Sequence, residues 1–346
     1  MADVDVQRFE AELTPQLGAA QRAIRLLMGF IAARAVYAAA KLGLADAIGS
    51  AGASAEDLAA RLGADASGLE RLLRALSGLG VVAQEENGRY SLTPIGASLR
   101  KDVPDSIRDY AIYVHEFLYD LFEGLVPGVM NGKPVVAEKL GAPLFAYLQQ
   151  HAEIAALFHA GLANRGRIEA PAILEAVSFA GCRKIADLGG GNGAFLSAIL
   201  AAYPAASGAL LERSAAIASA RRGEGGPLPR CTLIDGDYFA AVPAGCDAYI
   251  LKRVLFDHTT AEVVRVLRHC RDAMAPNGRV VIVEGLAAAP NEDSLQHLMD
   301  LTYLLATTGR MRGQEDYATL LRESGLRLDR CVATRADVSV LEASRA

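Results

Sequence analysis

The sequence lacks the markers of several protein classes. Its five cysteines are dispersed and form no Cys-x-x-Cys pair, which disfavours both a disulfide-framed secreted domain and a structural zinc site. The net charge of -5 leaves no positive excess of the kind that a protein needs to coat nucleic acid. These absences are typical of a protein with reduced thiols that binds neither a structural metal nor nucleic acid.

An export signal or membrane anchor is not expected either. The chain begins with acidic and polar residues, unlike a signal peptide. The most apolar early run, residues 26–44, is interrupted by Arg34 and Lys41. It therefore falls short of the ~20 uninterrupted apolar residues that a membrane span needs. We expect a cytoplasmic protein.

The length and the apolar content of the chain favour two domains. A single core rarely grows beyond about 250–300 residues, and this chain has 346 residues, of which 52% are hydrophobic. Residues from about 8 to 49 show apolar side chains at three- and four-residue steps, which predicts helix with a wide apolar stripe. Such a stripe needs a partner surface, either the rest of the chain or a second subunit.

Residues 54–100 have the pattern of a winged helix. Two amphipathic helical stretches are followed by short apolar strands that flank Asn87-Gly88, a strong hairpin signal, and Ser54 is placed to cap the first helix. Between Ser54 and Lys101, six Lys and Arg residues face six Asp and Glu residues, so the segment has no net charge. A helix that reads DNA needs positive charge, so a structural winged helix is favoured over a DNA-binding regulator.

The pattern changes from helical to alternating at about residue 183. Residues 105–180 are expected to be helical and rich in aromatic side chains. After them, short apolar strands alternate with helices, which is typical of a parallel α/β sheet. The expected strands cover residues 184–188, 209–211, 232–234, 248–251, 280–283, 326–334 and 338–342.

The segment Asp187-Leu-Gly-Gly-Gly-Asn-Gly193 follows the first of these strands and opens a helix expected over residues 194–202. Glycine lets the backbone approach a ligand, and the helix N-terminus favours negative charge, so a nucleotide-bearing cofactor is predicted here. The loop also fits a dinucleotide fingerprint, and Glu212, at the end of the second strand, suits a ribose in either case. Asp237, which is expected to end the third strand, and Tyr238 favour an adenine-bearing cofactor without a second nucleotide half.

These motifs, together with residues 251–255, 277–284 and 309–312, resemble the class I S-adenosylmethionine-dependent methyltransferases. More closely, the chain resembles the small-molecule O-methyltransferase family with an N-terminal dimerisation and winged-helix domain. The resemblance implies an α/β fold, in which a Rossmann-like seven-stranded sheet follows a mostly helical domain. It also implies a homodimer joined through the N-terminal helices. The implied segments are a dimerisation and winged-helix domain (1–105), a helical linker that walls the substrate pocket (106–180) and a cofactor domain (181–346).

The resemblance assigns the cofactor S-adenosyl-L-methionine and residues to bind it. The residues implied are Asp187, the glycines Gly189, Gly190 and Gly191 at the methionine part, Glu212 at the ribose, Asp237 and Tyr238 at the adenine, and Lys252 near the carboxylate. Less specifically, Phe256, Tyr303, Thr307, Phe145 and Tyr147 match regions that line the family's acceptor pocket. No metal site is expected, because the histidines have no metal-ligand spacing; a pair of His258 with His297 is conceivable, but the sequence does not bring them together.

The family's usual catalytic base is absent. Plant-like members carry a histidine four residues after the lysine, where this chain has Phe256, which cannot accept a proton. The favoured interpretation is methyl transfer by proximity and alignment to an amine, an acidic phenol or an activated carbon of a small aromatic or heteroaromatic secondary metabolite. Alternatively, Asp257 or His258 serves as the base, or the protein uses the cofactor in hydroxylation, decarboxylation or a pericyclic reaction.

Overall fold

Two structural units follow one another along the chain in the computed structural model, which describes residues 18–292 and 294–346. The first runs to Glu116 and the second begins at Phe117. Part of the N-terminal helix expected from about residue 8 lies outside the described residues. The division of the chain into three functional segments, with boundaries after residues 105 and 180, stays a prediction.

The first unit is mostly helical. Its elements are α2 (Ala19–Leu42), α3 (Leu44–Ile48), α4 (Ala55–Leu62), α5 (Ala66–Gly78), the strands β1 (Val82–Gln84) and β2 (Tyr90–Leu92), α6 (Pro94–Ala97) and α7 (Arg108–Tyr113). The Ser54 side chain accepts a hydrogen bond from the Asp57 N–H at 3.1 Å, so the predicted cap of α4 is confirmed. The antiparallel pair β1–β2 forms the expected hairpin.

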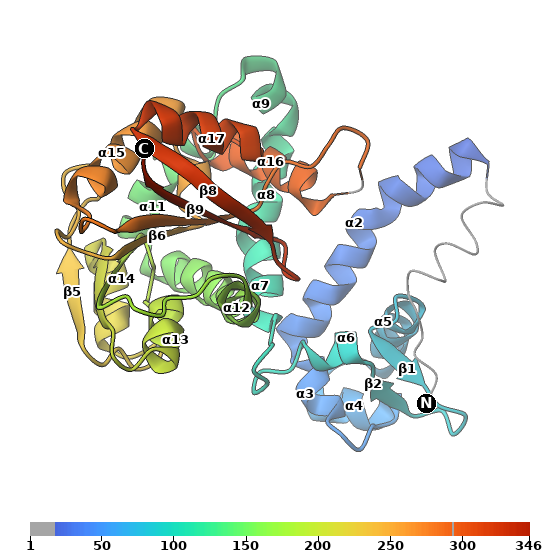
Figure 1. The fold of residues 1–346 in the computed structure, drawn as a ribbon. Coiled ribbons are helices and arrows are strands. Elements are labelled where there is room, and N and C mark those ends of the chain that lie inside the picture. The colour runs from blue at the N-terminus through green and yellow to red at the C-terminus, as the bar shows by residue number, and fades with distance from the viewer. Residues whose placement is uncertain (1–17, 293) are drawn as a thin grey trace. The chain divides into compact units, whose positions relative to one another are not determined.

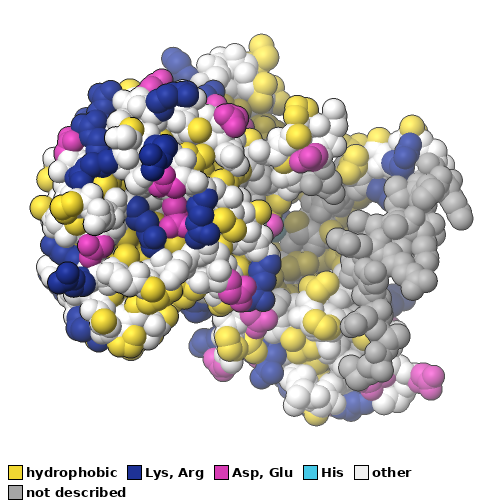
Figure 2. Space-filling view, in the orientation of Figure 1, with side chains coloured by type: hydrophobic (Ala, Val, Ile, Leu, Met, Phe, Trp, Pro, Cys, Tyr) yellow, Lys and Arg dark blue, Asp and Glu magenta, His cyan; other side chains and the backbone are white. Residues whose placement is uncertain are grey.

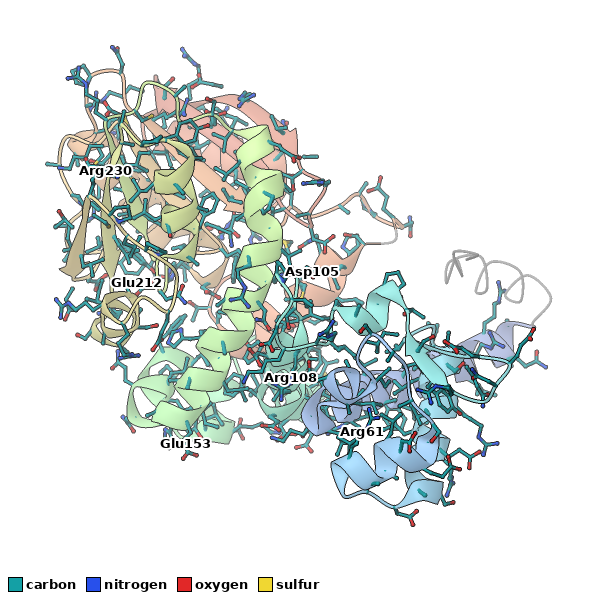
Figure 3. The ribbon with its side chains drawn as sticks, turned by 90° about the horizontal axis from the view of Figure 1, so that it is seen from below. Arg61, Asp105, Arg108, Glu153, Glu212 and Arg230 are labelled. Carbon is teal, nitrogen blue, oxygen red and sulfur yellow. The ribbon has the colours of Figure 1, made fainter. Side chains whose placement is uncertain are left out.

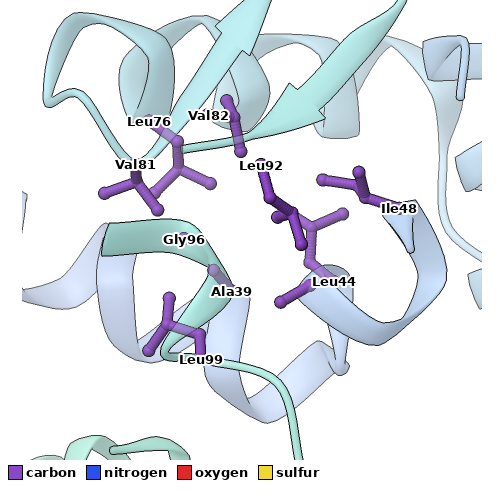
Figure 4. A pocket seen from close by; sticks show the side chains of 10 residues that line it. Ala39, Leu44, Ile48, Leu76, Val81, Val82, Leu92, Gly96 and Leu99 are labelled. Atoms are coloured by element: carbon purple, nitrogen blue, oxygen red, sulfur yellow. The ribbon is translucent and has the colours of Figure 1, made fainter. Parts of the chain in front are cut away.

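A small apolar pocket lies in the core of this unit (Figure 4). Its lining includes Leu44, Leu76 and Val81, whose side chains belong to the same buried cluster. No charged or hydroxyl-bearing side chain lines it. This pocket is therefore part of the packed core and is not a ligand site.

Helix α2 leaves a large apolar surface exposed. Leu26 is 83% and Leu27 is 69% exposed, and Ile24, Met28, Phe30 and Ile31 are also exposed. By length and composition alone, this helix could cross a membrane. The count of uninterrupted apolar residues did not indicate this, because two basic side chains do not stop a helix from being apolar on average. Its unburied face needs a partner surface.

The second unit begins with a series of helical segments. A π-helix, η2 (Val114–Leu118), joins the two units and is followed by α8 (Tyr119–Leu121), the 3-10 turn η3 (Phe122–Gly124), α9 (Leu125–Asn131), α10 (Val136–Leu140), α11 (Leu144–Gln150) and the long α12 (Ala152–Ala176). This confirms the helical pattern expected before residue 180.

A seven-stranded sheet forms the rest of the unit (Figure 1). Its elements are β3 (Lys184–Leu188), α13 (Ala194–Ala202), β4 (Ser207–Glu212), α14 (Ser214–Arg221), β5 (Cys231–Asp235), β6 (Ala248–Lys252), the 3-10 turn η4 (Leu255–Asp257), α15 (Thr260–Ala273), β7 (Arg279–Glu284), α16 (Leu295–Ala306), α17 (Gln314–Glu323), β8 (Leu326–Ala333) and β9 (Ser339–Arg345). The strand order is β5-β4-β3-β6-β7-β9-β8, and β9 runs in the direction opposite to that of the other six strands. The predicted α/β class and the seven strands are confirmed.

Both faces of the sheet are covered by helices, as Figure 1 shows. Alternate residues of the central strands point to opposite faces. Ile185 and Ile250 pack in the cluster that contains α12, α13 and α14, whereas Ala186 and Leu251 pack in the cluster of α15 and α17. The strand order reverses between β3 and β6, so a crevice for ligands is expected at the carboxyl ends of these two strands.

Charges of both signs are interspersed on the face of the second unit seen in Figure 2. Near the β8–β9 edge, Glu342 forms ion pairs with Arg279 at 3.0 Å and with Arg330 at 2.5 Å. That nucleic acid is not a partner stays a prediction.

Candidate cofactor and acceptor site

The glycine loop after β3 has the backbone shape that its sequence predicts. Gly189 and Gly191 have φ values of 70° and 59°, in the left-handed region that glycine tolerates best. A Cβ added to Gly191 would meet nothing within 4 Å, so its outer side is open to a ligand. Helix α13 begins directly afterwards at Ala194 and directs its N-terminus at the loop.

Asp187 lies at the centre of the sheet, beneath this loop. It pairs with Leu210 of β4 and Ile250 of β6, and it is only 1% exposed. Neither carboxylate oxygen has a hydrogen-bond partner among the described residues. Burial raises the pKa of Asp187 to about 7, although Lys252 opposes this rise. A buried carboxylate of this kind suits a cationic or N–H-bearing ligand group.

Glu212 ends β4 and supports the loop (Figure 3). Its Oε1 accepts a hydrogen bond from the Gly191 N–H at 3.2 Å, and its Oε2 accepts one from the Arg213 N–H at 2.6 Å. Burial raises the pKa of Glu212. The next acidic residue of the site, Asp237, accepts from Arg213 at 3.1 Å and from the Phe239 N–H at 2.8 Å. The two acids therefore lie on either side of Arg213, at neighbouring strand ends.

Lys252 is held by a buried acid that the sequence analysis missed. Its Nζ lies 2.8 Å from Glu169 on α12, and the Arg253 guanidinium lies 2.6 Å from the same carboxylate. Burial alone would raise the pKa of Glu169, but Lys252 and Arg253 outweigh it and hold that pKa at about 2. The only local signal was the spacing of Arg165 and Glu169, which form an i,i+4 pair at 3.1 Å.

Phe256 and Tyr303 are brought together, as the prediction that both line one pocket requires. Their rings stack with centroids 4.3 Å apart at an interplanar angle of 23°. Thr307 lies at the C-terminus of α16, where its hydroxyl donates to the Tyr303 carbonyl at 3.2 Å. Phe145 and Tyr147 lie on α11, where Phe145 is exposed and Tyr147 stacks on His151. Their part in acceptor binding stays a prediction.

The two candidate bases have different surroundings. Burial raises the pKa of Asp257 well above its ordinary value, and the nearby Glu284 adds to this rise. The His258 Nε2 lies 2.8 Å from the Tyr238 hydroxyl, and burial lowers the pKa of His258. His258 is therefore engaged by Tyr238, while Asp257 favours its protonated form.

A buried arginine, Arg312, holds the same segment from another side. It is 2% exposed, and it donates to the carbonyl oxygens of Leu255 at 2.8 Å and His258 at 2.7 Å. In the sequence, Arg312 is only the last residue of the 309–312 motif, and no pattern there indicates its role. Its contacts lie more than fifty residues away in the chain, so no local pattern could have shown them.

The conceivable metal pair does not form. His258 contacts Tyr238, whereas His297 lies 3.3 Å from the Ala289 carbonyl oxygen. Within the part of the chain that the structure describes, no three His, Cys, Asp or Glu side chains are grouped so as to hold a metal ion. All five cysteines are free.

Comparisons with known proteins agree with this geometry. An O-methyltransferase domain model matches residues 122–327, and an O-methyltransferase dimerisation domain model matches residues 24–102. The chain is 34% identical to phenazine O-methyltransferase PhzM of Lysobacter antibioticus over 92% of this chain and 94% of that protein. It is 33% identical to phenazine-1-carboxylate N-methyltransferase of Pseudomonas aeruginosa over 95% of this chain and 98% of that protein.

The identity of the cofactor is indicated by a solved structure of similar fold. The fold is similar to that of CalO1, a methyltransferase in calicheamicin biosynthesis solved with S-adenosylhomocysteine, with a TM-score of 0.85 and 31% identity over 96% of this chain and 100% of that one. The unpartnered carboxylate of Asp187 and the open side of Gly191 fit such a cofactor. The chain therefore belongs to the S-adenosylmethionine-dependent O-methyltransferase family that carries an N-terminal dimerisation domain.

Proposed function

We propose that this enzyme methylates an oxygen or nitrogen atom of a small, planar aromatic or heteroaromatic secondary metabolite. Relatives that act on phenazines by O- and by N-methylation support the substrate class and leave both acceptor atoms open. The observation that carries the proposal is the stacked pair of Phe256, on the loop that follows β6, and Tyr303, on α16. The five free cysteines suit the cytoplasm as its location.

In this proposal, five residues and the glycine loop hold the cofactor, which when bound would supply an electrophilic methyl group on a sulfonium. The Asp187 carboxylate accepts hydrogen bonds from the ammonium group of the methionine part. The Lys252 ammonium has three N–H donors, and Glu169 needs only one of them. The other donors can bind the methionine carboxylate, near which Lys252 is proposed to lie. Glu212 binds the ribose, and Asp237 and Tyr238 bind the adenine.

The proposed mechanism needs no dedicated base. Phe256 cannot accept a proton, and the Nε2 atom of His258 is engaged by Tyr238. An acidic phenol loses its proton to solvent before transfer, whereas an amine attacks with its lone pair and releases a proton afterwards. The protein then contributes by excluding water and by fixing the acceptor atom in line with the methyl group, for which proximity and orientation are large effects. Asp257 remains the alternative base, although its raised pKa means that it must first lose its own proton.

Calorimetry with S-adenosylhomocysteine tests the proposed cofactor site. We expect binding in the micromolar range for the wild type and its loss in Glu212→Ala and Asp237→Ala, because each substitution removes a carboxylate acceptor. Circular dichroism would confirm that both variants are folded. Binding of NAD without binding of S-adenosylhomocysteine would contradict the assignment. Mass measurement of products made from isotope-labelled methyl donor and candidate aromatics would then identify the acceptor.

A further inference from the structure

The segment from Arg253 to His258, here called the β6–α15 loop, touches both halves of the site. On the cofactor side, a Cβ added to Gly189 would lie 2.8 Å from the Val254 Cγ2 atom and 3.4 Å from the Tyr238 Cε1 atom. The glycine loop, the β6–α15 loop and the Tyr238 ring are therefore packed against one another. On the acceptor side, the same loop presents Phe256 to Tyr303.

Two buried polar side chains, Glu284 and Arg312, fix the backbone of this loop. The Glu284 Oε1 accepts hydrogen bonds from the N–H groups of Val254 at 3.0 Å and Leu255 at 2.9 Å. Arg312 donates to two carbonyl oxygens of the loop, and both Glu284 and Arg312 are at most 2% exposed. Four hydrogen bonds to these two buried side chains therefore hold the loop backbone in place.

His258 occupies the end of the loop nearest to Tyr238. Its Nε2 lies 2.8 Å from the Tyr238 hydroxyl, and its ring meets the Phe239 ring edge-on at 4.8 Å. The Arg265 guanidinium lies over the same Phe239 ring, with its Cζ atom 4.7 Å from the ring centroid. Burial favours neutral His258, and burial also keeps the Tyr238 hydroxyl protonated by raising its pKa. With the proton of the neutral imidazole on Nδ1, the tyrosine hydroxyl is the donor and Nε2 is the acceptor.

We propose that His258 is a positioning residue for the cofactor: by accepting the hydrogen bond of Tyr238, it holds the Tyr238 ring against the glycine loop and links it to Phe256. This inference rests on the proposed function, which places Tyr238 at the adenine. It gives His258 a role in cofactor affinity instead of proton transfer. It also connects His258, which lies two residues after Phe256, with cofactor binding at Tyr238.

A double-mutant cycle on S-adenosylhomocysteine affinity tests the pair without knowledge of the acceptor. Tyr238→Phe removes the donor and His258→Leu removes the acceptor, so each variant is expected to raise the dissociation constant by ~3- to 10-fold. The double variant should bind no more weakly than the weaker single variant, because both substitutions delete one interaction. His258→Gln, whose amide oxygen can still accept, should recover most of the affinity. Tyr203→Phe, which deletes a hydroxyl at the end of α13, is the matched control and should bind as the wild type does.

The possible outcomes separate this inference from the proposed function. Unchanged affinity in both single variants would overturn the positioning role, as would losses that simply multiply in the double variant. Failure of His258→Gln to recover affinity would show that the imidazole acts only as packing and would also overturn it. Absence of S-adenosylhomocysteine binding in the wild type would instead refute the proposed cofactor site itself.

Discussion

At the residue scale, Asp187 belongs to the proposed cofactor site, and its carboxylate lowers the stability of the folded protein when it is ionised. A carboxylate buried at the centre of the sheet without a partner among the described residues is costly when ionised. Its pKa rises from an ordinary value of 3.8 to about 7 because of burial. The folded state therefore binds this proton more tightly than the unfolded chain. Its stabilising contribution is complete below about pH 4 and is lost as the pH rises towards 7.

We predict that Asp187→Asn stabilises the cofactor-free protein at pH 8 by on the order of 1–3 kcal/mol, because it removes the buried charge. The same variant should bind S-adenosylhomocysteine weakly, because the amide cannot match an ionised acceptor. Denaturant unfolding at pH 5 and pH 8, with and without the ligand, measures both effects. Equal or lower stability of the variant at pH 8 would show that the carboxylate is not strained in the free protein.

At the element scale, α15 is supported by local and distant residues at its two ends. At the N-terminus, Thr259 and Glu262 form a reciprocal capping box, which is a pattern of neighbours in sequence. At the C-terminus, the Arg345 guanidinium donates to the carbonyl oxygens of Arg271 at 2.8 Å and Met274 at 2.7 Å. The N-terminus of α15 is therefore stabilised by neighbouring residues in the sequence. Its C-terminus is stabilised by Arg345, a residue of the last strand, β9.

The capping box gives a prediction about α15 that includes a neighbouring control. Thr259→Ala removes the side-chain acceptor for the Glu262 N–H and should lower the free energy of unfolding by about 1 kcal/mol. Thr260→Ala, at the next and equally exposed position, should change it by less than about 0.5 kcal/mol. Chemical denaturation of both variants provides the measurement. Equal losses in the two variants would show that the cap contributes nothing specific.

At the scale of the whole molecule, the exposed apolar face of α2 indicates assembly. Its leucines and isoleucines make a surface too apolar for a free helix in water, and the family's dimerisation domain model covers most of this helix. We expect a second copy of the chain to cover it. A homodimer joined through the N-terminal helices would also account for the apolar composition of α2.

We predict that the double substitution Leu26→Glu and Leu27→Glu shifts the protein from dimer towards monomer by at least tenfold in dissociation constant. Both side chains are at least 69% exposed, so the fold of the first unit should persist. Sedimentation velocity over a concentration series measures the shift, and Arg71→Glu on α5 serves as the charge-change control. A wild-type protein that remains monomeric, or a variant that dimerises unchanged, would rule out this interface.

Several elements could be predicted because their causes are local. Helix α13 begins and ends at the residues expected from the glycine loop and its apolar run, and β3 matches its predicted bounds. The caps and hairpin of the first unit follow from turn chemistry between near neighbours. Asp237 was placed at the end of the third strand, but β5 ends two residues earlier, at Asp235. The residue at which a strand ends depends on its pairing with neighbouring strands, and the periodicity of a sequence does not show that pairing.

By itself the sequence determined the order of helices and strands, the glycine loop before α13 and the absence of a histidine at position 256. These follow from periodicity, glycine conformation and residue identity, which are properties of short segments. Only the tertiary structure decided that Glu169 holds Lys252 and Arg253, that Arg312 fixes the β6–α15 loop, and that His258 contacts Tyr238. These partners lie 20 to 84 residues apart, and packing of the sheet and its helices brings them within hydrogen-bond distance.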